Sequence, residues 1–383
     1  MKNKQLHSRI LGLIGLVCMM GLIGCSKDEA AEPKSERSTE VQLAGYVADY
    51  DEAPMTNRSH EAYGTTRAWT PPSGYSAFET GEQSISVFFT EGTTAGDERF
   101  FFTSSGKWRV SGEELPSGTY YLYGYVPHDK SINTTLSVLP DDGKTYADGA
   151  ILTMANVPTV SSADFCVMIA AKNGKDDYKS DADYSVTNLK RGDFAYTSAE
   201  KNYVYLLFDH LFSALRLRMR VQGDYNNLRT IKLKELKLKT YEGETPITKK
   251  TNVIVTLTAN GEGNDPIKSV TFEPYGTETE AGSMFTSETG HELKETYQEF
   301  TGHFMPQGVT KLILESTYDV YDKKGNKLRL NCKAQNTINI SELFTLQTEA
   351  LRGRRYTINL TINPTYLYVL SEPDLNDPTV TVE

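Results

Sequence analysis

The side chains that most often carry out catalysis are sparse in this chain and form no catalytic pattern. Asp209 and His210 are adjacent, and neighbouring side chains in a strand point to opposite faces. We therefore expect His210 to be packed or hydrogen-bonded rather than to act as a base. Of the six histidines, four others lie beyond the N-terminal stretch and lack a partner at metal-ligand spacing: His60, His128, His291 and His303.

Other signatures of chemistry are equally weak. The chain contains no Gly-x-Ser-x-Gly elbow and no phosphate-binding loop. The paired acids Asp141-Asp142 and Asp176-Asp177 lie beside glycine or lysine and are typical of solvated turns, although a calcium site at either pair stays open. We expect no catalytic residue, no cofactor and no metal site. A β-sandwich glycosidase stays open as a minor alternative.

The four cysteines divide into an N-terminal pair and a pair in the body of the chain. Cys18 lies in the N-terminal apolar run and Cys25 directly follows it. Cys166 and Cys332 are far apart, each in an apparent strand. A disulfide between them would be compatible with an oxidising compartment, but two separately buried thiols are the preferred interpretation.

The N-terminus has the parts of an export signal. Basic residues at positions 2, 4 and 9 precede an apolar run from Ile10 to Ile23, which is short for roughly 30 Å of hydrocarbon and ends in a small residue. The run closes on Leu22-Ile23-Gly24-Cys25, which resembles the lipobox of bacterial lipoprotein precursors. The alternative is a plain signal peptide followed by a chance cysteine.

This motif predicts how the N-terminus is processed. Residues 1–24 are expected to be removed as a signal peptide, so that Cys25 becomes the first residue and carries acyl chains that hold the precursor on the outer membrane. Residues 25–38 are polar and suit a flexible tether. The chain is therefore expected at the cell surface.

Composition excludes some partners and favours one fold class. A net charge of -10 implies no general affinity for nucleic acid. The 383 residues allow two domains of ordinary size beyond the signal and tether. The 23 tyrosines and 15 phenylalanines are typical of half-buried strands.

Residues with a period of two predict the strands. Val41, Leu43 and Val47 share one face of a first candidate strand. Apolar residues at 215, 217, 219 and 221 alternate with three arginines. The same period runs through Ile231 and Leu233 but resumes out of phase at residue 236, which predicts a β-bulge near residues 234–235.

The pattern as a whole indicates a mostly antiparallel β protein. Turn signals such as Ser105-Gly106 and Lys324-Gly325-Asn326 separate the predicted strands, and no segment keeps the period of a long helix. The last residues, 379–382, alternate β-branched side chains where chain ends usually fray. That segment is expected to pair with something.

Four extended segments of the chain resemble the fimbrillin family, the lipidated precursors of type V pilus subunits. They are Leu206 to Leu215, Ser316 to Asp322, Tyr356 to Thr361 and Asn363 to Leu370. The resemblance implies two tandem transthyretin-like antiparallel β-sandwich domains. We expect an N-terminal domain of residues 39–200 and a C-terminal domain of residues 201–383, divided at a polar stretch near residue 200.

The resemblance also implies proteolytic maturation. In that family an arginine-specific protease removes the lipid, the tether and the first strand. Here the lost segment would be residues 39–67, which contains the strand of Val41, Leu43 and Val47, with cleavage after Arg67. Arg58 is the second choice, and both could be ordinary solvated arginines.

Donor-strand exchange is the implied assembly mechanism. The groove left by the first strand takes the C-terminal segment of another pilin subunit, with Val369, Val380 and Val382 as the expected donor residues. Such head-to-tail joining does not close on itself and gives a filament. The implied function is that of a fimbrial structural subunit that serves adhesion, with a host or bacterial surface ligand as a further partner.

Three other roles stay open. An anchor subunit would keep its lipid, and a tip subunit would tie its C-terminal strand into its own fold. A monomeric glycan-binding lipoprotein would present aromatic side chains, for which Tyr120, Tyr121, Tyr123 and Tyr125 are candidates. Alternating tyrosines, however, are more often cross-strand packing. Arg352, Arg354 and Arg355 are interpreted as a solvated face.

Overall fold

The computed structural model describes ten ranges of the chain, all within one compact unit, Arg37–Glu383. The ranges are 39–53, 75–77, 84–105, 107–139, 149–173, 194–197, 202–258, 266–344, 347–363 and 379–381. Several predictions fall outside them, namely the signal peptide, the tether, Cys25, Arg58, Arg67, the acidic pairs at 141–142 and 176–177, Val369 and Val382.

Strands dominate the described residues, as the sequence predicts. The helices among those residues are short: α1 (Gly223–Leu228) and α2 (Ile340–Leu343). The all-β prediction is therefore confirmed. No helix in the described ranges is both long and apolar enough to cross a membrane.

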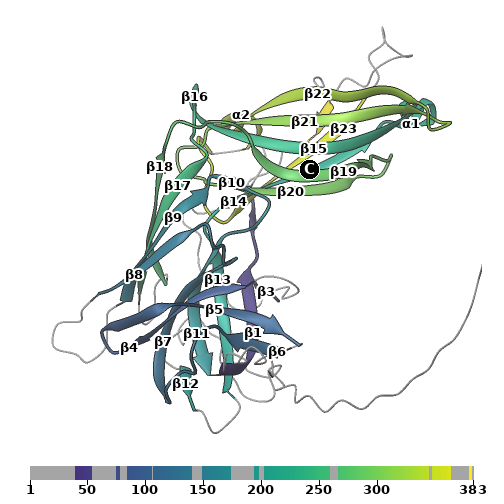
Figure 1. Ribbon diagram of the computed structural model, residues 1–383. Helices are drawn as coiled ribbons and strands as arrows, with labels where there is room; N and C mark the ends of the chain where they lie inside the picture. Colours follow the sequence, from purple (N-terminus) through teal and green to yellow (C-terminus); the bar gives the residue numbers. More distant parts are fainter. Residues whose placement is uncertain are drawn as a thin grey trace, which may run out of the picture. The chain divides into compact units, whose positions relative to one another are not determined.

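Seven strands close into a barrel in the order β11-β13-β1-β6-β5-β4-β7, because β11 pairs with both β13 and β7 (Figure 1). Each strand contributes side chains to one cluster, the barrel core, which includes Val41, Phe101 and Phe208. Two short strands attach to the barrel, β3 to β1 and β12 to β7. The bounds are β1 Thr39–Ala48, β3 Tyr75–Ala77, β4 Ile85–Glu91, β5 Thr94–Ser104, β6 Lys107–Val110, β7 Gly118–Val126, β11 Cys166–Asn173, β12 Phe194–Tyr196 and β13 Asn202–His210.

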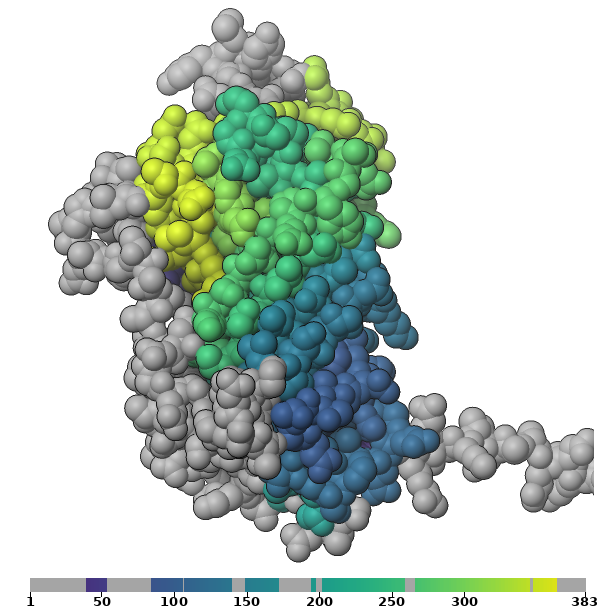
Figure 2. Space-filling model, turned by 90° about the vertical axis from the view of Figure 1, so that its left-hand side faces the viewer, coloured from purple at the N-terminus to yellow at the C-terminus, as the bar shows by residue number. Residues whose placement is uncertain are grey.

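A four-stranded sheet covers part of the barrel's outer surface. Its order is β18 (Ile267–Tyr275), β17 (Lys250–Thr258), β9 (Gly149–Pro158) and β8 (Asn133–Leu139). Leu152 and Val255 of this sheet pack in one cluster, the outer core, with Tyr123 and Tyr205 of the barrel. The pairing of β9 with β17 brings distant segments together, and Figure 2 shows blue and green residues in contact at the surface.

Two further sheets enclose a third apolar cluster, the sandwich core. Leu217 and Ile358 face it from one sheet, and Leu236 and Leu314 from the other. The first sheet contains β10 (Val160–Ser161), β20 (Gln298–Phe304), β14 (Ser213–Val221), β23 (Arg354–Ile362), β2 (Asp51–Glu52) and β24 (Thr379–Thr381). The second contains β16 (Thr245–Pro246), β15 (Arg229–Glu242), β21 (Lys311–Asp322), β22 (Lys327–Asn339) and β19 (Gly282–Glu292).

Several local predictions are confirmed. Strand β14 alternates buried apolar residues with half-buried arginines. The register of β15 shifts between Leu233 and Glu235, which is the predicted bulge. Strands β5 and β6, on either side of the predicted turn, pair antiparallel from Ser104 and Lys107 onward. Most pairings are antiparallel, but β1–β13, β14–β23 and β2–β23 are parallel.

The domain boundary near residue 200 stays a prediction, and strand pairing crosses it. Strand β13 follows that boundary but pairs with β1 and β11 of the barrel. After His210 the chain enters β14 of the sandwich through Leu211 and Phe212, which are both fully buried, although the short strands β2 and β10 of the same sheet precede it. Strand β17 in turn pairs with β9.

Candidate functional site

Strand β1 closes the barrel and is covered on both faces. Val41 is 1% exposed, and Leu43 and Val47 pack against the same barrel core, so these three residues share one face as predicted. Ala44 and Tyr46, on the opposite face, pack against the outer core. The alternation of β1 thus places apolar side chains in two separate clusters.

Two neighbouring strands depend on β1 for their backbone partners. Residues 41–47 of β1 pair in parallel with residues 202–208 of β13, and residues 39–41 pair with residues 108–110 of β6. A closed barrel has no free edge. Without β1, the facing edges of β13 and β6 would lose their strand and become sites for another one.

The segment after β1 is held by a buried polar cluster. The ring of Tyr50 stacks on His210, with 3.5 Å between centroids, and the Tyr50 hydroxyl donates to Asp164 Oδ1 over 2.7 Å. His210 Nδ1 lies 2.8 Å from Asp164 Oδ2, and His210 Nε2 lies 2.5 Å from the carbonyl oxygen of Ala48. His210 therefore links β13 to the end of β1.

Electrostatic contacts hold this cluster together. Each His210 nitrogen faces an acceptor, Asp164 Oδ2 at Nδ1 and the Ala48 carbonyl oxygen at Nε2. Burial by itself raises the pKa of Asp164, but the charge and hydrogen bond of His210, aided by His303 and Tyr50, lower it to about 2. Burial and the charge of Asp164 raise the pKa of Tyr50 well above its ordinary value.

Two further side chains complete the cluster. Cys166 Sγ lies 3.4 Å from His210 Nδ1, since Cys166 and His210 are register partners in the β11–β13 pair. His303 Nε2, from β20, lies 3.9 Å from Asp164 Oδ2. Burial and the neighbouring His210 lower the pKa of His303, while Asp164 opposes them. Asp164, Cys166 and His210 are close enough to share a metal ion.

Sequence reasoning predicted a packed or hydrogen-bonded His210 but missed the rest of the cluster. Its members come from β11, the loop before it, β13 and β20, so no short spacing connects them. Cys166 opens one strand and His210 ends another, and only the pairing of β11 with β13 makes them neighbours. The two described cysteines, Cys166 and Cys332, form no disulfide.

Strand β2 ties the same N-terminal segment to β23. Asp51 N–H donates to the carbonyl oxygen of Gly353, and Ala53 N–H to that of Arg355. Glu52 accepts hydrogen bonds from Arg355 Nε, over 2.6 Å, and from Arg216 Nη2, over 3.2 Å.

The interpretation of the three arginines before the last strands as a solvated face is wrong. Arg354 is only 6% exposed, and Arg355 pairs with Glu52. Arg352 Nη1 lies 2.9 Å from Asp209 Oδ2 and donates to the carbonyl oxygen of His210. These contacts arise because the chain brings β23 beside β2 and the end of β13, a proximity that the sequence pattern does not reveal.

The C-terminal strand pairs within its own chain. Residues 379–381 of β24 run antiparallel to residues 359–361 of β23, with Val380 opposite Leu360. Together β2 and β24 cover the two ends of one β23 edge. A tip subunit is expected to tie its C-terminal strand into its own fold in this way.

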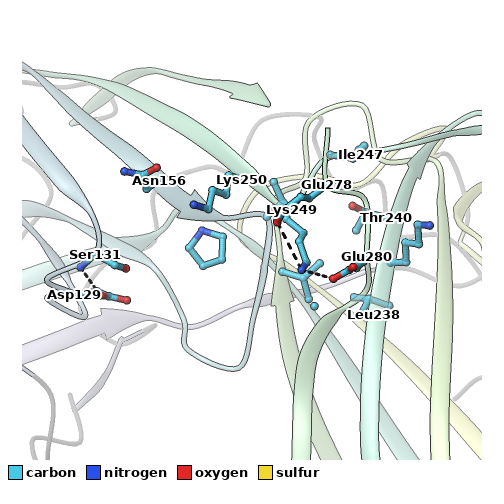
Figure 3. A pocket seen from close by; sticks show the side chains of 15 residues that line it. Asp129, Ser131, Asn156, Leu238, Thr240, Ile247, Lys249, Lys250, Glu278 and Glu280 are labelled. Carbon is cyan, nitrogen blue, oxygen red and sulfur yellow. Dashed lines mark hydrogen bonds and ion pairs between the residues drawn. The ribbon is translucent and has the colours of Figure 1, made fainter. Parts of the chain in front are cut away.

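A pocket of about 320 Å³ lies between β15, β17 and the segment before β19 (Figure 3). Lys249 points toward Glu280 and Glu278, and its ammonium group is 2.6 Å and 3.8 Å from their carboxylates. Hydrogen bonding to Glu280 raises the pKa of Lys249. The lysine charge is thus already balanced, and nothing in the pocket singles out a ligand class.

The tyrosines considered for glycan binding are mostly internal. Tyr123 and Tyr125 are fully buried and Tyr120 is 5% exposed, which leaves Tyr121 partly exposed. Their role in packing is confirmed, because Tyr123 and Tyr125 belong to the outer core and Tyr120 to the barrel core.

Comparisons with known proteins give weak similarities. No protein-family model and no curated protein sequence matches the chain. Among solved structures, a provisionally assigned cell adhesion protein from Bacteroides fragilis is 10% identical, covers 89% of this chain and 96% of its own, and has a TM-score of 0.37. A fimbrial protein from Bacteroides ovatus is 11% identical, covers 85% of this chain and 50% of its own, and has a TM-score of 0.30.

Proposed function

We propose that the chain is the precursor of a pilin, a structural subunit of a cell-surface fimbria that serves adhesion. In this proposal it is exported as a lipoprotein on Cys25, cleaved after Arg67 and joined head to tail by donor-strand exchange. The proposal includes the two tandem transthyretin-like antiparallel β-sandwich domains that the resemblance implies.

The observation that carries the proposal is the position of β1. It is the first strand of the described chain, yet it lies inside a closed barrel between β13 and β6. Both candidate arginines, Arg58 and Arg67, follow it before β4 begins. A single cut there would separate a barrel-closing strand from the rest of the chain.

The energetics favour refilling the gap with another strand. Fully burying an apolar side chain contributes roughly 1.5–3 kcal/mol, so Val41 and the partly buried Leu43 and Val47 supply at most about 9 kcal/mol gross. The open barrel would also leave backbone groups of residues 202–208 without partners. A strand with apolar residues at alternate positions, such as Val380 and Val382, satisfies both needs.

The first experiment is the intact mass and N-terminal sequence of the protein recovered from the cell surface. A chain beginning at Ala68 supports cleavage after Arg67, and a chain beginning at Ser59 moves the site to Arg58. A chain that still begins with acylated Cys25 contradicts the stalk-subunit proposal and favours an anchor or a monomeric surface lipoprotein.

A tip subunit is the second candidate, because β24 pairs with β23 of the same chain. In a stalk subunit this strand would leave its own β23 and enter a neighbour. Val380→Asp separates the two roles: a stalk subunit would stop donating and filaments would shorten, whereas a tip subunit would still be incorporated. Filament length by electron microscopy provides the measurement.

A further inference from the structure

The cluster around His210 brings four metal-binding side chains together without an assigned role. Asp164 lies in the loop before β11, Cys166 at the start of β11, His210 at the end of β13 and His303 in β20. Asp164 Oδ2 and Cys166 Sγ lie beside His210 Nδ1, and His303 Nε2 approaches Asp164 Oδ2. The proposed pilus assembly gives these four side chains no function.

We propose that Asp164, Cys166, His210 and His303 form a zinc-binding site. One thiolate, two imidazoles and one carboxylate are the donors that Zn²⁺ takes in four-coordinate protein sites. A hard cation such as Ca²⁺ or Mg²⁺ is disfavoured, because it prefers oxygen ligands throughout. The proposal does not depend on fimbrial assembly.

The distances fit after small movements. Tetrahedral zinc with ordinary bond lengths places nitrogen and oxygen ligands about 3.4 Å apart and nitrogen and sulfur about 3.6 Å apart. His210 Nδ1 is 2.8 Å from Asp164 Oδ2 and 3.4 Å from Cys166 Sγ. His303 Nε2 is 3.9 Å from Asp164 Oδ2, which is too long for a hydrogen bond. Shifts on the order of half an ångström bring the ligand atoms of Asp164, Cys166 and His210 to zinc geometry, and His303 completes the site through a larger side-chain movement.

Without a metal ion, a hydrogen bond joins two of the ligand atoms. His210 Nδ1 and Asp164 Oδ2 are 2.8 Å apart, with one proton between them. Zinc would take this position between the two atoms, so the Nδ1 proton and the thiol proton of Cys166 leave to solvent as Zn–N and Zn–S bonds form. His210 then keeps its second proton on Nε2, and its ring becomes a neutral ligand.

The hydrogen bonds around the ligands also match a metal site. Ligating histidines usually donate their other N–H to a carbonyl or carboxylate, which fixes the ring. His210 Nε2 donates to the carbonyl oxygen of Ala48, and the Tyr50 hydroxyl donates to Asp164 Oδ1, which leaves Oδ2 for the ion. The tautomer of His210 and the orientation of Asp164 are therefore already those of a zinc ligand.

Burial favours a structural site with limited access. The side chains of His210 and His303 are 4% and 11% exposed, whereas that of Asp164 is 26% exposed. The ion would reach the cluster from the Asp164 side. Since Ala48 and Tyr50 supply the supporting hydrogen bonds, zinc binding and the seating of this N-terminal segment reinforce each other.

Cobalt provides the direct test in the unaltered chain. The chelator-treated full-length protein is titrated with Co²⁺ alone, then with Zn²⁺. We expect one Co²⁺ per chain, intense visible absorption typical of tetrahedral cobalt, a near-ultraviolet thiolate-to-cobalt band, and loss of both when Zn²⁺ is added. A cobalt complex without the thiolate band, or no binding, overturns the proposal.

Variants identify the ligands. Cys166→Ser should abolish the thiolate band, and His303→Gln should abolish the tetrahedral spectrum. Tyr50→Phe should weaken Zn²⁺ binding by roughly ten- to a hundredfold, because it removes only a supporting hydrogen bond. Matched controls are Cys332→Ser, the other described body cysteine, and His128→Gln, a histidine 3.7 Å from Glu98 in the barrel.

The controls also separate the proposal from misfolding. Cys332→Ser and His128→Gln should bind like the unaltered protein, and far-ultraviolet circular dichroism reports whether each variant keeps its strands. A thiolate band that persists in Cys166→Ser but disappears in Cys332→Ser assigns the metal elsewhere and overturns the site. So does a folded His303→Gln variant with an unchanged cobalt spectrum.

Discussion

His210 Nε2 donates a hydrogen bond to the carbonyl oxygen of Ala48 over 2.5 Å, although 162 positions separate the two residues. Ala48 is the last residue of β1, and His210 is the last residue of β13. Because these strands run parallel, their ends meet at the same rim of the barrel. The end of the barrel-closing strand is thus held by the imidazole ring of His210.

His210→Phe tests this fastening. The phenylalanine ring can still stack on Tyr50, but Asp164 loses its histidine partner and the carbonyl of Ala48 loses its donor. Breaking one partner of a buried ion pair costs about 3–5 kcal/mol. We expect the free energy of unfolding, measured with urea, to fall by that amount. His291→Phe, an exposed histidine, is the control, and equal losses in both variants would contradict the role of His210.

Val41→Ala tests the contribution of β1 to the barrel core. The change removes two buried methyl groups at a site that is 1% exposed, and we expect a loss of about 2 kcal/mol. Glu40→Ala, one position earlier, affects only surface ion pairs with Lys107 and Arg109 and should cost at most about 1 kcal/mol. Thermal unfolding of the two variants gives the comparison. A smaller loss for Val41→Ala than for Glu40→Ala would contradict the packing.

The strands of this fold could be predicted because their signal is local. The alternation in β14 and the phase change in β15 depend on neighbouring residues, and both are confirmed. The same alternation places Val41, Leu43 and Val47 on one face. Such patterns reflect which face of each strand is buried, and that information survives without knowledge of the partner strands.

Strand partners could not be predicted, and the candidate site depends on them. Cys166 and His210 become neighbours only because β11 pairs with β13, and His303 arrives from β20. Arg354 looked solvated because charged residues usually are, yet the chain buries it beside β2. These features depend on which strands pair, and the periodicity of a single sequence does not reveal strand partners that are far apart in the chain.

Proteolytic maturation predicts a sharp difference between two arginines. Arg67→Lys should block an arginine-specific protease, so the chain keeps residues 39–67 and does not polymerise. The Arg58→Lys variant should be processed normally, so that its mature chain begins at Ala68. N-terminal sequencing and filament formation are measured on both variants. Normal processing of Arg67→Lys together with a block in Arg58→Lys would move the site to Arg58.

Removing the hydroxyl group should change the free energy of unfolding in opposite directions at two buried tyrosines. Tyr225 is fully buried, and its hydroxyl has no hydrogen-bond partner among the described residues. Tyr356, equally buried, donates to Gln347 Oε1 over 2.6 Å and accepts from Leu351 N–H over 2.9 Å. At neutral pH, urea unfolding should show Tyr225→Phe unchanged or about 1 kcal/mol more stable, and Tyr356→Phe about 1–3 kcal/mol less stable.

Alkaline pH gives Tyr225 a second, independent readout. Burial raises its pKa from 10.0 to about 12, with Cys332 acting in the same direction and Arg229 opposing them. The folded state thus favours the neutral phenol, so this contribution to stability is complete below pH 10 and is lost as the pH rises from about 10 to about 12. Tyr225→Phe should remove that part of the alkaline decline in the free energy of unfolding. If the unaltered protein and Tyr225→Phe decline in parallel over this interval, the hydroxyl is not held neutral by burial.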